Sequence, residues 1–334
     1  MKKVLVSVFA VIIVFSSCKE QKKSSALLTN VTGKSGEVVL VIDPDQWSSD
    51  AGEQFRKKLN EEHPALPQRE PMFDLIHIPF EAFTSIFKTH RNIILAKVDK
   101  DLHEPKMVVQ EDVWAKPQII VNVLAQSDSA LAAVIKEKGD ILVDRILRKE
   151  ISRYAKNNEK YDQIEISERL KRKFGIKLTI PQGYSLDLDT TNFAWLESKG
   201  RGDMVQGVLI YSYDIPELEL STDYIFTKRT EFTKKFVPGP TDGSYMTVEK
   251  EAIPYRRDIE VNGINVIELR NLWKIENDFM GGPFISFTFI DEKNNKVINI
   301  DGFVFAPRFD KRDYLRQMEA ILNSVQMPIN EPVN

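Results

Sequence analysis

The stretch PFISFTFIDEKNNKVINIDGFVFA (residues 283–306) decides the fold of the second half of the chain. Two apolar runs, Pro283–Ile290 and Lys296–Ala306, lie on either side of Asn294–Asn295, a pair that suits a tight turn. Runs rich in β-branched and aromatic residues, separated by a turn of this kind, are typical of paired antiparallel strands. The stretch therefore predicts a β-hairpin within an antiparallel sheet.

More strand candidates precede this hairpin, and Asn262–Gly263 suits a second tight turn. Between residues 176 and 276 these candidates are IKLTIPQGYSLDL, FAWLES, VQGVLIYSY, SYMTVEK and INVIELRNLWKIE. Helices are expected at Glu159–Phe174, Ser221–Phe236 and Lys311–Val325, from the spacing of their apolar residues. Residues 158–330 are thus predicted to form a second domain, a largely antiparallel sheet with packed helices.

The first half alternates strands with helices instead. Its first apolar run, Glu37–Asp43, is short and rich in valine, which predicts a buried strand. Further strands are predicted at Phe73–Ile78, Asn92–Val98 and Gln118–Leu124, and helices at Ser48–Glu62, Phe80–Thr89 and Ser129–Asn157. Residues 36–157 are therefore predicted to form an alternating α/β domain, and the whole chain an α+β protein of two domains.

The N-terminus MKKVLVSVFAVIIVFSSC has the three parts of a secretory signal peptide, predicted over residues 1–17. Its apolar run of roughly 12 residues is shorter than the ~20 that a membrane-spanning helix needs. The residues before Cys18 resemble a bacterial lipobox, with Phe15 where leucine is usual. The alternative is an ordinary signal peptide with an incidental cysteine.

Cys18 is the only cysteine in the chain, and we expect it to carry a thioether diacylglycerol and an amide-linked acyl chain such as palmitate. Stable anchoring needs more than one acyl chain, and this modification supplies it. With Cys18 acylated, the chain has no thiol left for disulfides or catalysis. The polar residues 18–35 are predicted to form a flexible tether.

Charge and motifs exclude several classes of function. A net charge of −3 and a pI near 6.0 argue against nucleic-acid binding. No later segment is apolar over enough residues to span a membrane, and the phosphate-binding loop, the nucleophile elbow and the dinucleotide fingerprint are all missing from the sequence. No cofactor is expected.

Acidic residues follow the first predicted strand, where clefts of α/β domains tend to form. Asp43, Asp45 and Glu53 surround Trp47, and paired carboxylates there could perform acid–base chemistry or hold a hard cation. The same D-P-D-x-W pattern also suits a turn followed by a helix N-terminus, where acids complement the helix dipole. Both interpretations stay open.

All four histidines lie in the first half, at intervals of 13 or 14 residues: His63, His77, His90 and His103. The spacing lacks the pairing of a helical zinc site, and no metal is expected. Arg91 and Asn92 could bind an anionic ligand at a turn. Alternatively, Arg91 pairs with an acid of the fold, such as Glu70 or Asp74.

Several motifs resemble a family of bacteroidete lipoproteins that is catalogued as a domain of unknown function. They are the lipobox, GEVVLVIDPDQW, LPQREPMFDL, KTHRNII, IPQGY, MGGPFISF and DGFVFAP. The resemblance implies location and architecture, with no activity attached. The order of elements in the second half is also similar to the Mog1/PsbP-like α/β sandwich, and fold alone does not fix function.

Together these features predict a protein of the cell envelope, anchored by lipid to a bacterial membrane, which we expect to be the outer one. We expect a non-enzymatic binding or assembly module whose partner is an envelope protein or a cell-surface ligand. The rival hypothesis is a hydrolase or metal-assisted enzyme with Asp43, Asp45, His77 and His90 in its site. Whether Asp43, His77 and His90 converge in one concave pocket separates the two hypotheses.

Overall fold

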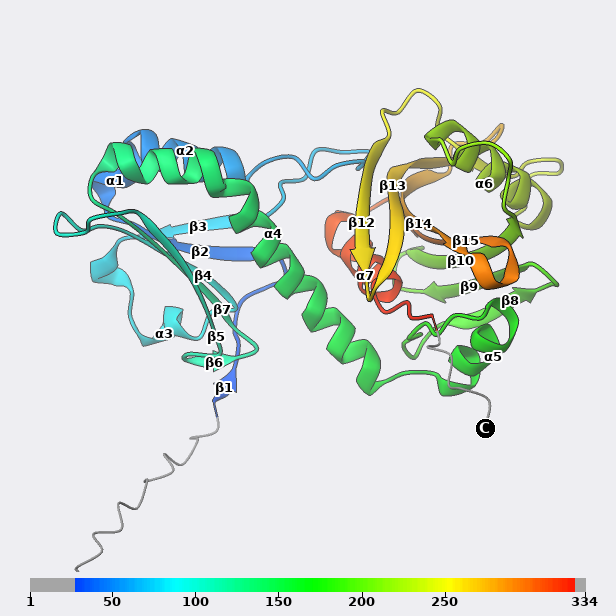
Figure 1. Ribbon diagram of the computed structural model, residues 1–334, viewed down its shortest axis with the longest axis horizontal. Helices are drawn as coiled ribbons and strands as arrows, with labels where there is room; N and C mark the ends of the chain where they lie inside the picture. The colour runs from blue at the N-terminus through cyan, green and yellow to red at the C-terminus, as the bar shows by residue number, and fades with distance from the viewer. Residues whose placement is uncertain (1–27, 328–334) are drawn as a thin grey trace, which may run out of the picture.

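Two lobes joined by one long helix make up the molecule, as the computed structural model of residues 28–327 shows (Figure 1). Helix α4 (Asp128–Lys160) begins in the first lobe and ends beside the second, and its 33 residues cover about 50 Å. Cys18 and the predicted signal peptide lie outside the described residues. Within residues 28–327, no helix is both long enough and apolar enough to cross a membrane.

The first lobe is built on a five-stranded sheet in the order β3-β2-β4-β7-β5. Its strands are β2 (Glu37–Val41), β3 (Asp74–Ile78), β4 (Asn92–Val98), β5 (Lys106–Glu111) and β7 (Ile119–Ala125). Strands β2, β3, β4 and β7 run parallel to one another, and β5 lies antiparallel at the edge. Central parallel strands are covered on both faces, which explains why their sequences are continuous apolar runs.

Helices α2 (Asp50–Leu59) and α4 cover one face of this sheet, where their apolar side chains share a core with β2, β4 and β7. The short helices η1 (Phe80–Ala82) and α3 (Ser85–Lys88) lie in the chain between β3 and β4, and phenylalanines of this segment pack on the opposite face. The single helix predicted at Phe80–Thr89 is therefore wrong. Thr84 is extended and separates the two pieces, since threonine favours caps over helix interiors.

The predicted helix Ser48–Glu62 is also divided, into α1 (Pro44–Ser48) and α2. Ser49 separates them and caps α2 by accepting a hydrogen bond from the amide of Ala51.

The predicted tether is folded in its last part. Strand β1 (Thr29–Asn30) pairs in parallel with β6 (Ala115–Lys116), so the chain is held against the first lobe from Thr29 onward.

The second lobe is an eight-stranded antiparallel sheet in the order β11-β13-β14-β15-β10-β9-β8, with β12 also paired to β13. The strands are β8 (Ser185–Asp189), β9 (Phe193–Lys199), β10 (Val205–Asp214), β11 (Met246–Val248), β12 (Tyr255–Val261), β13 (Ile264–Ile275), β14 (Gly281–Asp291) and β15 (Lys296–Phe305). The predicted hairpin is β14–β15, joined by η2 (Glu292–Asn294). Asn295 adopts the left-handed conformation that this turn requires.

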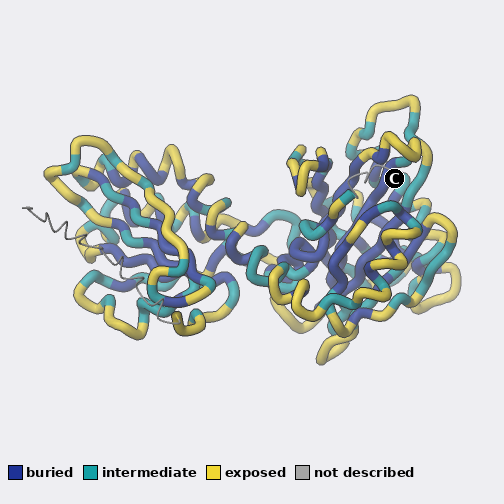
Figure 2. The backbone as a smooth tube through the Cα atoms, turned by 60° about the horizontal axis from the view of Figure 1, so that its bottom comes forward, coloured by how far each residue is buried: buried dark blue, intermediate teal, exposed yellow. Residues whose placement is uncertain are grey.

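Helices cover both faces of this sheet (Figure 1). Helix α7 (Arg312–Leu322) and the apolar side of α5 (Ile164–Phe174) pack on one face, and α6 (Thr222–Phe236) packs on the other. Buried backbone follows the strands of both lobes, and exposed backbone is concentrated in the loops (Figure 2). The α+β class with two domains is thus confirmed.

Three details of the second lobe differ from expectation. Helix α5 begins at Ile164 and not at Glu159, because α4 continues to Lys160. Residues 176–180 are buried except for Lys177 and form only an isolated bridge at that residue, so the predicted strand there is confined to β8. Strand β12 was not expected, because its sequence YRRDIEV is mostly charged.

A carboxylate from the first lobe caps a helix of the second. Glu70 Oε1 accepts a hydrogen bond from the amide of Lys311 at 2.7 Å, and its Oε2 accepts one from the amide of Arg312 at 2.8 Å. These amides open α7, whose N-cap residue Lys311 supplies no capping side chain of its own. Glu70 is 6% exposed, so the buried carboxylate meets the positive end of the helix.

Arginines of α7 extend this junction. Arg312 forms a two-pronged ion pair with Asp74, at 3.2 and 2.8 Å, and Arg316 donates to the carbonyl of Met72. Gly36 makes room for both arginines, because a Cβ atom there would lie 2.6 Å from Arg312 Nη2. The junction is therefore specific and polar.

Candidate functional site

Asp43 and Asp45 follow β2 at the carboxyl edge of the parallel sheet, and both are exposed. Asp43 is the N-cap residue of α1 without a side-chain cap bond, and Asp45 lies in the first turn. His77 Nε2 lies 3.0 Å from the carbonyl oxygen of Ile42, and its ring stacks on Trp47 at a centroid distance of 4.3 Å. These contacts hold the imidazole within the fold.

His90, Arg91 and Asn92 lie at the opposite, amino edge of the same sheet. His90 Nε2 is 3.3 Å from Glu37 Oε2, and Glu37 is the first residue of β2. The five residues of β2 separate the two edges by about 16 Å. Asp43 and His77 therefore do not share a site with His90. Among residues 28–327 no group of three or more histidine, cysteine or acidic residues could hold a metal ion.

Arg91 and Asn92 belong to a buried network around Glu150 of α4. Glu150 is fully buried, accepts a hydrogen bond from Asn92 Nδ2 at 2.6 Å, and pairs with Arg91 at 3.0 Å. Arg153 binds the same carboxylate at 2.6 Å, and burial lowers the pKa of Arg153 to about 10. The network ties α4 to the sheet. Arg91 thus pairs with an acid of the fold, and that acid is Glu150.

The two acids that sequence analysis offered to Arg91, Glu70 and Asp74, bind α7 at the domain junction instead. His63 also lies there, 4% exposed, with Nε2 4.0 Å from Glu319 Oε1. Burial, together with the positive charges of Arg270 and Arg316, lowers the pKa of His63 well below its usual range. His103 is exposed.

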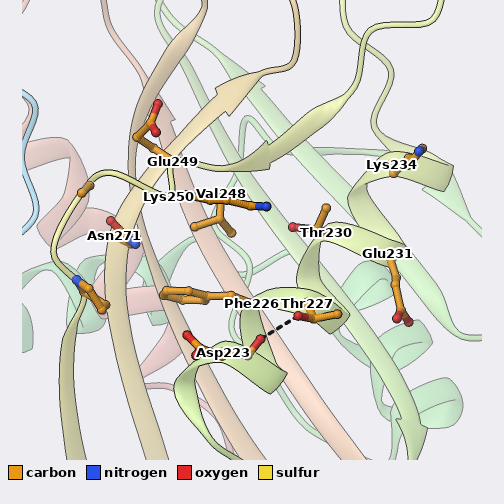
Figure 3. Close-up of a pocket in the computed structure, with 12 residues that line it drawn as sticks. Asp223, Phe226, Thr227, Thr230, Glu231, Lys234, Val248, Glu249, Lys250 and Asn271 are labelled. Carbon is orange, nitrogen blue, oxygen red and sulfur yellow. Dashed lines mark hydrogen bonds between the residues drawn. The ribbon is translucent and has the colours of Figure 1, made fainter.

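A groove lies in the second lobe, between α6 and the segment that joins β11 to β12 (Figure 3). Its volume is ≈ 520 Å³, within the range of small-molecule pockets. From α6 it is lined by Asp223, Phe226, Thr227, Thr230, Glu231 and Lys234, and from the other side by Val248, Glu249, Lys250, Ala252, Pro254 and Asn271.

The topology of the sheet leaves Asn271 facing this groove. Strands β11 and β12 both pair with β13, β11 opposite residues 273–275 and β12 opposite residues 264–270. The amide of Glu249 still donates to the Leu272 carbonyl at 2.8 Å, and residues 250–254 then leave the sheet, so no paired strand residue lies beside Asn271 on that edge. Asn271 is 2% exposed and lines the groove.

A buried ion pair lies beneath the groove. Arg229 of α6 and Asp301 of β15 are both fully buried and pair at 2.8 Å, and Tyr211 donates to Asp301 at 3.4 Å. Burial raises the pKa of Asp301, and the positive charge of Arg229 opposes that effect. Phe284 lies over the Arg229 guanidinium at 4.0 Å, and Phe226 meets Phe284 edge-on at 5.9 Å. The floor of the groove therefore packs on Phe284, which covers the buried ion pair of Arg229 and Asp301.

The sequence pattern singles out no residue of this groove. The helix Ser221–Phe236 and the strand around residue 264–276 were both expected, but their side chains meet only through the strand order of the sheet. A usable signal was Phe226, an aromatic residue in a helical stripe otherwise made of charged residues and threonines.

Comparisons with known proteins give two family-model matches and a distant structural neighbour. LpqN of Mycobacterium tuberculosis, described as involved in cell envelope biogenesis, has a solved structure that covers 46% of this chain and 83% of LpqN, with 12% identity and a TM-score of 0.27. No curated protein matches the chain. Residues 31–159 match the family model described as domain of unknown function DUF8532, and residues 163–324 match that of DUF4837. Each half of the chain thus matches its own family of unknown function.

Proposed function

We propose that this protein is a lipid-anchored binding module of the bacterial cell envelope that holds a ligand in the groove beside α6. The observation that carries the binding role is the groove itself, where the buried amide of Asn271 lies at the base of a largely apolar cleft. A few polar groups in an apolar pocket are typical of small-molecule binding sites.

The arrangement of titratable residues supports a non-enzymatic role. The rival hydrolase or metal-assisted enzyme needs Asp43, His77 and His90 in one site, and these residues lie at opposite edges of a sheet. His77 and His90 each contact a group of the fold.

The lipid anchor is supported by the sequence at Cys18 and by the bacteroidete lipoprotein resemblance. That the anchoring membrane is the outer one belongs to the same proposal, and the likeness of the second half to a Mog1/PsbP-like sandwich stays a prediction. The proposed partner is an envelope component that reaches the groove from the membrane surface.

Cell fractionation tests the anchor. Cys18→Ala should leave the protein in the soluble fraction or as an uncleaved precursor, because no residue remains to receive the lipid. Ser24→Ala in the predicted tether is the matched control and should mature normally. A Cys18→Ala chain that matures and stays with the membrane would disprove lipid anchoring.

Crosslinking in living cells tests the groove. A photoreactive residue at Thr227, which is exposed inside the groove, should give an adduct detectable by intact-mass spectrometry. The same group at Lys235, exposed on α6 and outside the groove lining, should give none. Equal adducts at both positions, or none at Thr227, would contradict the binding role.

A further inference from the structure

We infer that the groove beside α6 takes a small amphipathic carboxylate, an apolar body with a single anionic end. This inference rests on the proposed binding function and names the class of ligand. The apolar body would lie against Phe226 and Val248, and the carboxylate would face the Asn271 amide at the base, in the positive potential of Lys234 and Lys250.

The orientation of the Asn271 amide is fixed by the backbone. Its Oδ1 accepts a hydrogen bond from the amide of Leu272 at 2.8 Å, which assigns the oxygen and turns Nδ2 away from that contact. Within residues 28–327, Nδ2 donates no hydrogen bond to another protein atom. Because Asn271 lines the groove, this unpaired donor is available to a ligand, and an oxygen of the ligand would satisfy it.

The walls select an apolar body of limited size. Phe226 points into the groove from α6, opposite Val248 (Figure 3). Ala252 and Pro254 close the side formed by the segment between β11 and β12. The Phe226 ring rests on Phe284, which in turn covers the buried Arg229 guanidinium, so it is held ready for contact with a ring or a short chain.

Charges at the rim favour an anion. Two of the three acids are already neutralised, Glu231 by Lys228 at 2.8 Å and Glu249 by Lys274 at 3.2 Å. The third, Asp223, lies in the first turn of α6, where the helix dipole stabilises it.

The lysines of the rim are not neutralised in this way. In the described part of the chain, Lys250 has no acidic partner, and Lys234 contacts the Tyr245 ring at 4.8 Å. Lys234 and Lys250 together outweigh Asp223, the one acid of the lining without a cationic partner, so the unpaired charge of the groove lining is positive on balance and complements a carboxylate.

Nuclear magnetic resonance on the folded chain from residue 28 tests the inference with three probes of one shape: phenylbutyrate, its primary amide and phenylbutylamine. We expect phenylbutyrate to shift the side-chain amide signal of Asn271 and to bind most tightly. The primary amide keeps the oxygen but loses the charge, and should bind about tenfold less tightly. Phenylbutylamine should bind least, and added salt should narrow the difference.

Matched variants locate the effect. Asn271→Asp keeps the acceptor for the Leu272 amide but loses the donor, and should weaken phenylbutyrate binding by at least about tenfold. Lys250→Gln should weaken it about threefold, whereas Lys235→Gln, on α6 but outside the groove, should leave it unchanged. If Asn271→Asp does not fold, Lys250→Gln against Lys235→Gln decides the question.

Two outcomes would overturn the inference. If phenylbutylamine or the neutral amide binds as tightly as phenylbutyrate, the ligand is not a carboxylate, while the groove remains the binding site and the proposed function stands. If none of the probes shifts the Asn271 signal at millimolar concentration, the inferred class is wrong. The crosslinking adduct at Thr227 then decides separately whether the proposed function survives.

Discussion

A buried pair of charged residues, Arg229 and Asp301, joins α6 to the sheet of the second lobe. Asp301 lies on the face of β15 that α6 covers, and its Oδ1 has no hydrogen-bond partner among the described residues. Arg229 Nη1 likewise has no hydrogen-bond partner among the described residues. Both ends of this ion pair are therefore costly to bury alone, and each residue depends on the other.

Asp301→Ala should lower the free energy of unfolding by about 3–5 kcal/mol, because it leaves the Arg229 guanidinium buried without its counter-charge. Urea unfolding followed by circular dichroism measures the loss. Asp258→Ala on the exposed strand β12 is the control, since its pair with Arg256 at 3.5 Å is at the surface. A loss for Asp301→Ala no larger than that of the control would contradict a buried ion pair.

At the scale of an element, the stability of helix α7 depends on the carboxylate of Glu70 that caps it. Glu70→Ala removes both acceptors from the first amides of the helix, and should destabilise the protein by about 1–2 kcal/mol or more. Glu62→Ala, whose pair with Arg69 is exposed, should cost little. Denaturant midpoints compare the two variants, and equal values would refute the cap.

His63 makes the same junction sensitive to acid. Its pKa is lowered in the folded state by burial and by Arg270 and Arg316, so the unfolded chain takes up the proton first, near 6.5. The contribution of a neutral His63 is complete above that pH and is lost as the pH falls below it. The groups that face it from β13 and α7 are Arg270, Arg312, Arg316 and Glu319.

Stability should therefore fall by up to about 1.4 kcal/mol per pH unit below about pH 6.5. His63→Gln should flatten this dependence, and His103→Gln, which alters an exposed side chain, should keep it. Unfolding free energies measured at several pH values give the slopes. A slope that survives in His63→Gln would assign the acid sensitivity to another group.

At the scale of the whole molecule, the junction ties the stability of one lobe to the other. Residues 33–157 and 158–334 expressed separately should each melt cooperatively, since each has its own core. The second fragment should melt at a lower temperature than in the full chain, because α7 loses the Glu70 cap. Calorimetry of the fragments, alone and mixed, tests this, and loss of cooperative melting in both would mean one intertwined domain.

The sequence predicts this architecture where a pattern is local. The apolar run at Glu37–Asp43 and the turn at Asn294–Asn295 each determine their own structure within a few residues. Strand β12 was not predictable, because its charged residues are stabilised only by pairing along β13. The groove was not predictable either, since Asn271 faces it only because two strands share one edge of β13.

The Glu70 cap has a consequence for the order in which the protein is made. Its carboxylate is 241 residues earlier in the chain than the amide of Lys311 that it binds. Domains form from the N-terminus during synthesis, so the acceptor is in place long before the last helix emerges. A chain that ends prematurely lacks α7, leaves the part of its large sheet that α7 covers exposed, and displays an unmatched carboxylate. A complete chain should therefore resist proteases better than a truncated one. Pulse-labelled truncated chains should be degraded first.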